Sequence, residues 1–166
     1  MRRLTQATTV IFLLFAASSV AAADSEPDIY VSPEAVRDMQ KSGQNFLFFD
    51  ARLKRDYDSR HITGAALPLP LKYYNDLELF TAKILPEHPD KDAAMREAMT
   101  NVPQSAKIVA YCNRDCQASK IMAMDLRRMG FADSTAMKDG IQGWEERGFP
   151  VEGEEVQAVA AESVKN

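Results

Sequence analysis

The chain has 166 residues, two cysteines and a formal net charge of −4 at pH 7. A mildly acidic chain lacks the dense positive charge that nucleic-acid binding requires, so we expect no nucleic-acid partner. Its length and composition are typical of one globular domain that buries its own hydrophobic core and needs no disulfide scaffold.

Residues 1–23 have the pattern of a signal peptide. Arg2 and Arg3 supply positive charge, an apolar run from Val10 to Val20 follows, and three alanines end at Ala23. Signal peptidases cleave after small residues of this kind, and the apolar run is too short and too rich in serine and alanine for a transmembrane helix. We therefore expect secretion to the periplasm and no stable membrane anchor.

Strand-like and helix-like segments alternate along the rest of the chain. The expected strands are 28–31, 46–49, 107–111 and 134–137, and the expected helices begin at Ser32-Pro33, at residue 90, at residue 118 and just before Trp144. This alternation predicts an α/β fold, a single-domain parallel sheet flanked by helices on both faces, over residues 28–151. Residues 71–90 fit neither pattern, and 152–166 are expected to form an acidic C-terminal tail.

Two candidate site residues follow directly after expected strands. Asp50 follows the strand 46–49, and Cys112 follows the strand 107–111. Sites in parallel α/β sheets lie beyond the carboxyl ends of the strands. A short polar loop and the start of a helix come after Cys112, and a helix N-terminus stabilises negative charge. The sequence therefore predicts a nucleophilic, low-pKa thiolate at Cys112.

The second cysteine, Cys116, lies four residues further along the chain. Two nearby thiols tend to pair in an oxidising compartment, although a disulfide over this spacing would be strained. Cys116 could therefore resolve an adduct on Cys112, or it could be a loop residue without a chemical role. Two cysteines at this spacing can also bind Cu(I). The two histidines, His61 and His88, do not extend such a group, and we expect no metal site.

Three segments resemble the rhodanese-like domain family. They are Asp50-Ala51-Arg52 with Asp56 and His61-Ile62-Thr63-Gly64-Ala65, the strand, loop and helix around Cys112, and Gly140 with Trp144 and Gly148-Phe149-Pro150-Val151. The three stand in the family's order, so the resemblance implies a rhodanese-like fold. It implies structural roles for Asp50, Arg52, Asp56, His61, Gly140 and Trp144. Among these, Asp50 and Arg52 are expected to form a structural ion pair or hydrogen-bond set with Asp56 as a further partner, and Trp144 is expected to anchor the core.

The resemblance also implies a chemistry. Rhodanese-like enzymes take up a sulfane sulfur as a persulfide on the strand-end cysteine, a role that falls to Cys112. The family's loop wraps backbone amides around this sulfur and usually carries a glycine and a later basic residue. Here neither is present, and the loop is one residue longer. The residues expected to bind substrate are Asn113, Arg114, Asp115, Gln117 and Ser119, with Arg114 attracting an anion or lowering the thiol pKa.

The spacing Cys-x-x-x-Cys-x-x-Ser resembles a secreted rhodanese-like subgroup associated with quinoprotein alcohol oxidation, whose tryptophan after the second cysteine is Gln117 here. The expected function is sulfur transfer or thiol redox chemistry at Cys112 without a cofactor. Its expected partner is a small sulfur-containing substrate or a thiol acceptor. Two alternatives stay open: a non-catalytic binding module that keeps the fold, and a Cu(I)-handling dithiol protein.

Overall fold

The structure is a computed structural model of the chain, and it describes residues 28–69 and 91–157. The expected signal peptide, the segment 71–90 and residues 158–166 of the expected tail lie outside the described residues. Within the two described ranges, the helices are too short or too polar to span a lipid bilayer.

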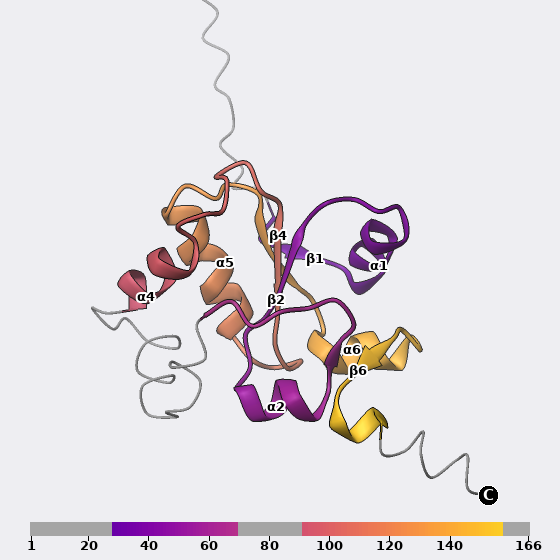
Figure 1. Ribbon diagram of the computed structural model, residues 1–166. Helices are drawn as coiled ribbons and strands as arrows, with labels where there is room; N and C mark the ends of the chain where they lie inside the picture. The colour runs from indigo at the N-terminus through magenta and orange to yellow at the C-terminus, as the bar shows by residue number, and fades with distance from the viewer. Residues whose placement is uncertain (1–27, 70–90, 158–166) are drawn as a thin grey trace, which may run out of the picture.

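A four-stranded parallel sheet with the strand order β1-β5-β4-β2 forms the centre of the fold (Figure 1). Its strands are β1 (Tyr30–Val31), β2 (Leu47–Asp50), β4 (Ile108–Tyr111) and β5 (Ser134–Met137). In the register of β2 and β4, Asp50 lies opposite Tyr111, so both strands end at the same level. The predicted α/β fold with a parallel sheet is confirmed.

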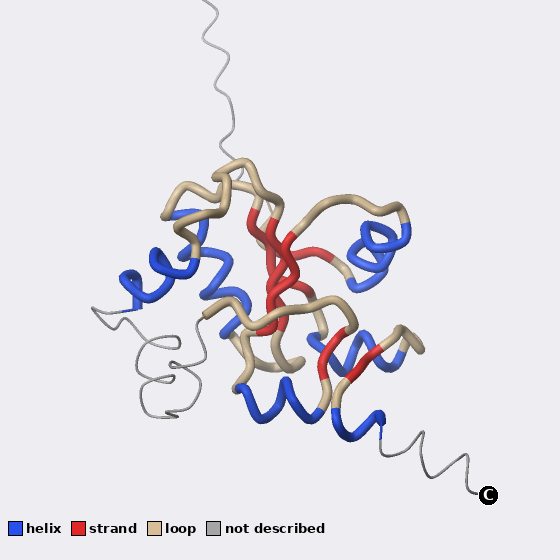
Figure 2. Tube along the Cα trace, in the orientation of Figure 1, coloured by secondary structure: helices blue, strands red, loops and turns tan. Residues whose placement is uncertain are grey.

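Helices cover both faces of this sheet (Figure 2). On one face lie α1 (Pro33–Lys41) and α6 (Gly140–Glu146), and on the other lie α4 (Lys91–Ala98) and α5 (Ala118–Arg128). Side chains of successive strand residues point to opposite faces, so a continuous apolar run in a strand supplies both cores at once.

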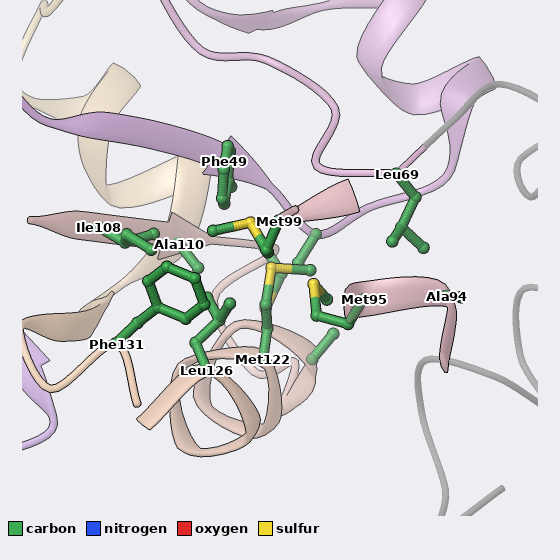
Figure 3. Close-up of a cluster of buried hydrophobic side chains, with 13 residues drawn as sticks. Phe49, Leu69, Ala94, Met95, Met99, Ile108, Ala110, Met122, Leu126 and Phe131 are labelled. Carbon is green, nitrogen blue, oxygen red and sulfur yellow. The ribbon is translucent and has the colours of Figure 1, made fainter. Parts of the chain in front are cut away.

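The core beneath α4 and α5 is rich in methionine (Figure 3). Met95 from α4 and Met122 from α5 pack with Phe49 of β2 and Ala110 of β4. Each large apolar side chain buried in this way stabilises the fold by about 1.5–3 kcal/mol relative to its exposed state. The packing fixes α5, and with it the end of the loop that connects β4 to α5.

The core beneath α1 and α6 centres on Trp144, which is fully buried. Its indole Nε1–H donates to the carbonyl oxygen of Pro150 at 3.0 Å. Phe48 of β2 and Tyr111 of β4 lie in the same core, together with Ile141 of α6. These contacts hold the N-terminal half of α6 against the carboxyl end of β4.

Three short elements were not among the sequence predictions. They are the helix α2 (Lys54–Ser59) and the antiparallel strands β3 (His61–Ile62) and β6 (Val151–Glu152). The helix α2 buries none of its residues, so it carries no apolar periodicity. The two-residue strands exist because they pair with each other across the chain. The expected tail therefore begins inside β6, and its described part continues as a helical turn over 154–157.

Candidate active site

The carboxyl ends of β2 and β4 hold a buried cluster of Asp50, Arg52 and Tyr111. The Asp50 carboxylate accepts hydrogen bonds from Arg52 Nη2 and from the Tyr111 hydroxyl, both at 2.6 Å. Arg52 Nη2 also donates to the Arg60 carbonyl at 2.6 Å, and the Tyr111 hydroxyl accepts the Ile62 N–H at 3.1 Å. Burial raises the pKa of Tyr111 well above its ordinary value. Buried charges that are paired and hydrogen-bonded to this degree form a structural element.

Two further residues with expected structural roles lie near this cluster. The described ion-pair partner of Asp56 is Arg55, whose Nε lies 3.6 Å from Asp56 Oδ1 at the surface, and not Arg52. The His61 ring stacks on Tyr57 with 3.8 Å between ring centroids. His61 Nδ1 lies 2.7 Å from the Tyr57 carbonyl oxygen, and Nε2 lies 3.3 Å from a Glu152 carboxylate oxygen. His61 thus links α2 to the β3–β6 pair.

Cys112 directly follows β4, and it is only 1% exposed. Its Sγ lies 3.1 Å from the carbonyl oxygen of Cys116, 3.4 Å from that of Asn113 and 3.3 Å from the Ser119 hydroxyl. Carbonyl oxygens accept the thiol proton and repel a thiolate. The pKa of Cys112 is raised, first by its hydrogen bond to the Cys116 side chain and then by burial, while Ser119 opposes the shift. Burial and the two carbonyl oxygens thus oppose the low pKa that the sequence predicts for Cys112.

Cys116 is partly exposed and lies just before α5. A hydrogen bond of 3.1 Å from the Cys116 N–H to the Asn113 carbonyl oxygen turns the chain back toward Cys112. The Cys116 Sγ accepts the N–H of Ala118, the first residue of α5, at 3.3 Å. The Cys112 thiol and then the backbone amides of Ala118 and Asn113 lower the pKa of Cys116 from its ordinary 9.0 to about 6, although burial opposes them. The Ala118 N–H and the partial exposure of Cys116 thus favour its thiolate form.

The N-terminus of α6 supports the loop from its other side. The Ile141 N–H donates to the Cys112 carbonyl oxygen at 2.9 Å. Gly140 adopts φ +55°, and a Cβ there would lie 2.5 Å from the carbonyl carbon of Asn113 and 2.7 Å from the nitrogen of Arg114. Real side chains do not approach backbone atoms this closely. Gly140 is therefore required because the loop lies directly against it.

Two residues of α6 that the sequence analysis did not single out hold the first half of the loop. Gln142 Oε1 accepts the Arg114 N–H at 2.9 Å, and its Nε2 donates to Asn113 Oδ1 at 3.1 Å. The Arg114 guanidinium pairs with Glu146. The charge of Arg114 is therefore partly neutralised by the Glu146 carboxylate. Gly140 is the sequence feature that could have pointed to these two residues. A glycine at the start of a helix near the carboxyl end of the sheet indicates that another chain segment approaches this helix closely.

An open cavity of about 450 Å³ lies beside the loop. Its lining residues are Asn113, Arg114, Asp115, Cys116 and Gln142. Gln117, also expected to bind substrate, is exposed outside this lining, and Ser119 is buried beside Cys112. The cavity thus gives access to the Cys116 thiolate, whereas Cys112 is not part of its wall.

Outside the loop, the described residues form a further cavity and no metal-binding cluster. A larger cavity of about 570 Å³ opens at the amino ends of β2 and β4, and its lining contains neither cysteine. Among residues 28–69 and 91–157, no group of three or more histidine, cysteine, aspartate or glutamate residues is arranged to hold a metal ion. The chemistry available in the described part of the chain therefore centres on the two thiols.

Both a family model and a curated relative match a large part of this chain. A sequence model of the rhodanese-like domain matches residues 32–147. A probable adenylyltransferase/sulfurtransferase of Mycobacterium tuberculosis is 25% identical over 114 residues, which is 69% of this chain and 24% of that protein. The chain thus spans about a quarter of the length of this curated relative.

Solved structures support the fold. The rhodanese-like domain of an Anabaena protein superposes with a TM-score of 0.56 at 21% identity, over 78% of this chain and 82% of the domain. A 3-mercaptopyruvate sulfotransferase of Escherichia coli superposes with a TM-score of 0.52 at 19% identity, over 76% of this chain and 52% of that one. At these identities the likeness concerns the fold alone.

Proposed function

Since the chain belongs to the rhodanese-like domain family, we propose that it performs sulfur transfer or thiol redox chemistry at Cys112 and Cys116. The observation that carries this proposal is the pairing of a buried thiol, Cys112, with a partly exposed one, Cys116, whose sulfur accepts the Ala118 N–H at 3.3 Å. These surroundings lower the pKa of Cys116. A thiol with such a pKa is ionised near neutral pH and is a competent nucleophile toward S–S bonds. The substrate is a small compound with a sulfane or disulfide sulfur, and the acceptor is a thiol.

The proposed compartment is the periplasm, on the strength of the signal-peptide pattern in residues 1–23. An oxidising compartment suits a pair of cysteines that cycles between dithiol and disulfide forms. The Cys-x-x-x-Cys spacing further suggests membership in the secreted subgroup associated with quinoprotein alcohol oxidation. Fractionation of cells that express the full chain, with N-terminal sequencing of the product, tests the location: a mature protein in the periplasm that starts near Asp24 is expected, and an uncleaved cytoplasmic product would contradict it.

Intact-mass spectrometry tests the chemistry. The reduced protein is mixed with thiosulfate, with an inorganic polysulfide or with oxidised glutathione. We expect an added sulfur, a glutathione adduct or the loss of two hydrogens as an internal disulfide forms. The double variant Cys112→Ser/Cys116→Ser should show none of these changes. A wild-type protein that stays unmodified by every donor would refute the proposed function.

A non-catalytic binding module is the second candidate, and the burial of Cys112 favours it, because a thiol that is 1% exposed at the family's catalytic position is shielded from substrate. Iodoacetamide separates the two candidates. Fast alkylation at pH 7 is expected for a protein with a reactive thiolate, whereas labelling no faster than that of an ordinary thiol with a pKa near 9 supports the binding module.

A further inference from the structure

We propose that Cys116 is the thiol that attacks the substrate and that Cys112 is the resolving thiol, which inverts the roles that the resemblance implied. This inference rests on the proposed function. The surroundings of the two sulfur atoms decide which thiol reacts with the substrate first and which thiol reacts second. The strand-end position of Cys112 alone would give the opposite order.

Access favours Cys116 as the first nucleophile. Cys116 is partly exposed and lines the 450 Å³ cavity. Cys112 is 1% exposed and packs in the core beneath α5 with residues such as Met122. A substrate sulfur that enters the cavity therefore meets Cys116 first, and it could reach Cys112 only after the loop had opened.

The groups around each sulfur favour the same order. The Cys116 sulfur accepts the Ala118 N–H at 3.3 Å, at the positive end of the α5 dipole. The Cys112 sulfur faces the carbonyl oxygens of Cys116 and Asn113 at 3.1 and 3.4 Å. Amide hydrogens stabilise a thiolate and carbonyl oxygens stabilise a thiol, so the reduced pair rests as a Cys116 thiolate beside a Cys112 thiol.

The reaction balances as two exchanges. The Cys116 thiolate attacks one sulfur of a compound R–S–S–R′, which forms Cys116–S–S–R and releases R′S⁻. Cys112 then attacks the Cys116 sulfur, its proton passes to the departing RS group, and RSH leaves as the Cys112–Cys116 disulfide forms. The substrate S–S bond gains two electrons and the cysteine pair loses the same two. Cys112 Sγ lies 3.1 Å from the Cys116 carbonyl oxygen, so the two cysteines are in contact before the second step.

Peptide mapping of the wild-type protein tests the order without a mutation. Trypsin cleaves after Lys107, Arg114 and Lys120, so the two cysteines fall in separate peptides. After a short pulse of iodoacetamide at pH 7, we expect the label on the peptide that contains Cys116, at a level about tenfold or more above Cys112, since one unit of pKa changes the thiolate fraction about tenfold. A label mainly on Cys112 would overturn the assignment.

Single variants test the second step. With oxidised glutathione, Cys112→Ser should accumulate a stable mixed disulfide on Cys116, because no second thiol resolves it. Cys116→Ser should form an adduct on Cys112 about tenfold or more slowly, and thiosulfate should give the same order of rates if sulfane donors use the same thiol. Thermal melts establish that both variants are folded. An adduct on Cys112 at the wild-type rate would refute this inference and leave the proposed function intact, whereas no reaction of the wild type would refute the proposed function.

Discussion

Substitution of Gly140 by alanine should lower the free energy of unfolding for two reasons, backbone strain and a steric contact with the loop. The φ of +55° strains any residue with a Cβ by about 1–2 kcal/mol. The new Cβ would also press against the Cys112 carbonyl oxygen and lie 2.7 Å from the Arg114 nitrogen. Backbone atoms have to move to relieve this contact, and the 2.9 Å hydrogen bond from Ile141 to Cys112 is weakened, which costs about 0.5–1.5 kcal/mol. The expected loss of unfolding free energy is about 1.5–3.5 kcal/mol.

Gly148 offers a matched control. Its φ is +66°, and a Cβ there would meet nothing within 4 Å. Gly148→Ala should therefore cost only the conformational term, about 1–2 kcal/mol. Urea unfolding of both variants under reducing conditions measures the difference, and amide hydrogen exchange of Ile141 reports the loss of its bond to the loop. Equal losses in the two variants, or unchanged protection of Ile141, would refute the argument that the loop rests on Gly140.

The remaining predictions concern charge and pH. Asp50→Asn leaves the buried Arg52 guanidinium without its counter-charge and should lower the unfolding free energy by about 3–5 kcal/mol, measured by urea unfolding. Asp133→Asn, which breaks the more exposed pair with Lys107, should change it by about 0–1 kcal/mol, and equal losses would contradict the role assigned to burial. In the reduced protein, stability relative to Cys112→Ser/Cys116→Ser should rise as the pH increases from about 6 toward 9, because the unfolded chain still holds the proton that folded Cys116 has released. Above about pH 9 this stability difference should fall, because Cys112, whose pKa is raised in the folded state, keeps its proton there and loses it in the unfolded chain. A pH-independent difference between the two proteins would rule out both shifts.

The layered fold could be predicted because its strands carry a local signal. Every residue of β2 before Asp50 is apolar, and β4 is apolar or aromatic throughout, including Tyr111. A strand that is buried on both faces requires such a run. The helix α1 begins at a capping Ser32, which accepts the Ala35 N–H at 3.2 Å. By contrast, α2 buries no residue, and β3 and β6 are defined only by each other, so nothing local marked them.

The location of the site could be predicted from the sequence, but the ionisation of its thiols and the contacts around them could not. The place of Cys112 after a buried strand put the thiols at the correct edge of the sheet. The ionisation of each thiol depends on which backbone groups point at its sulfur, and this is decided by the turn from Asn113 to Cys116. A contact such as that between Gln142 and Asn113 joins segments 29 residues apart and leaves no trace in either segment alone.

Within the described residues, the first half of the loop is hydrogen-bonded to α6 and the second half is not, so the two halves should tolerate substitutions differently. Asn113 and Arg114 are tied to Gln142, whereas Asp115 and Gln117 are exposed on the other side of the turn. Changes at Asp115 can therefore alter the wall of the cavity, and changes at Gln117 the exposed surface that follows Cys116, at little expense to the framework beneath. A library randomised at these two positions, with both cysteines kept, is a direct route to variants that accept different sulfur compounds.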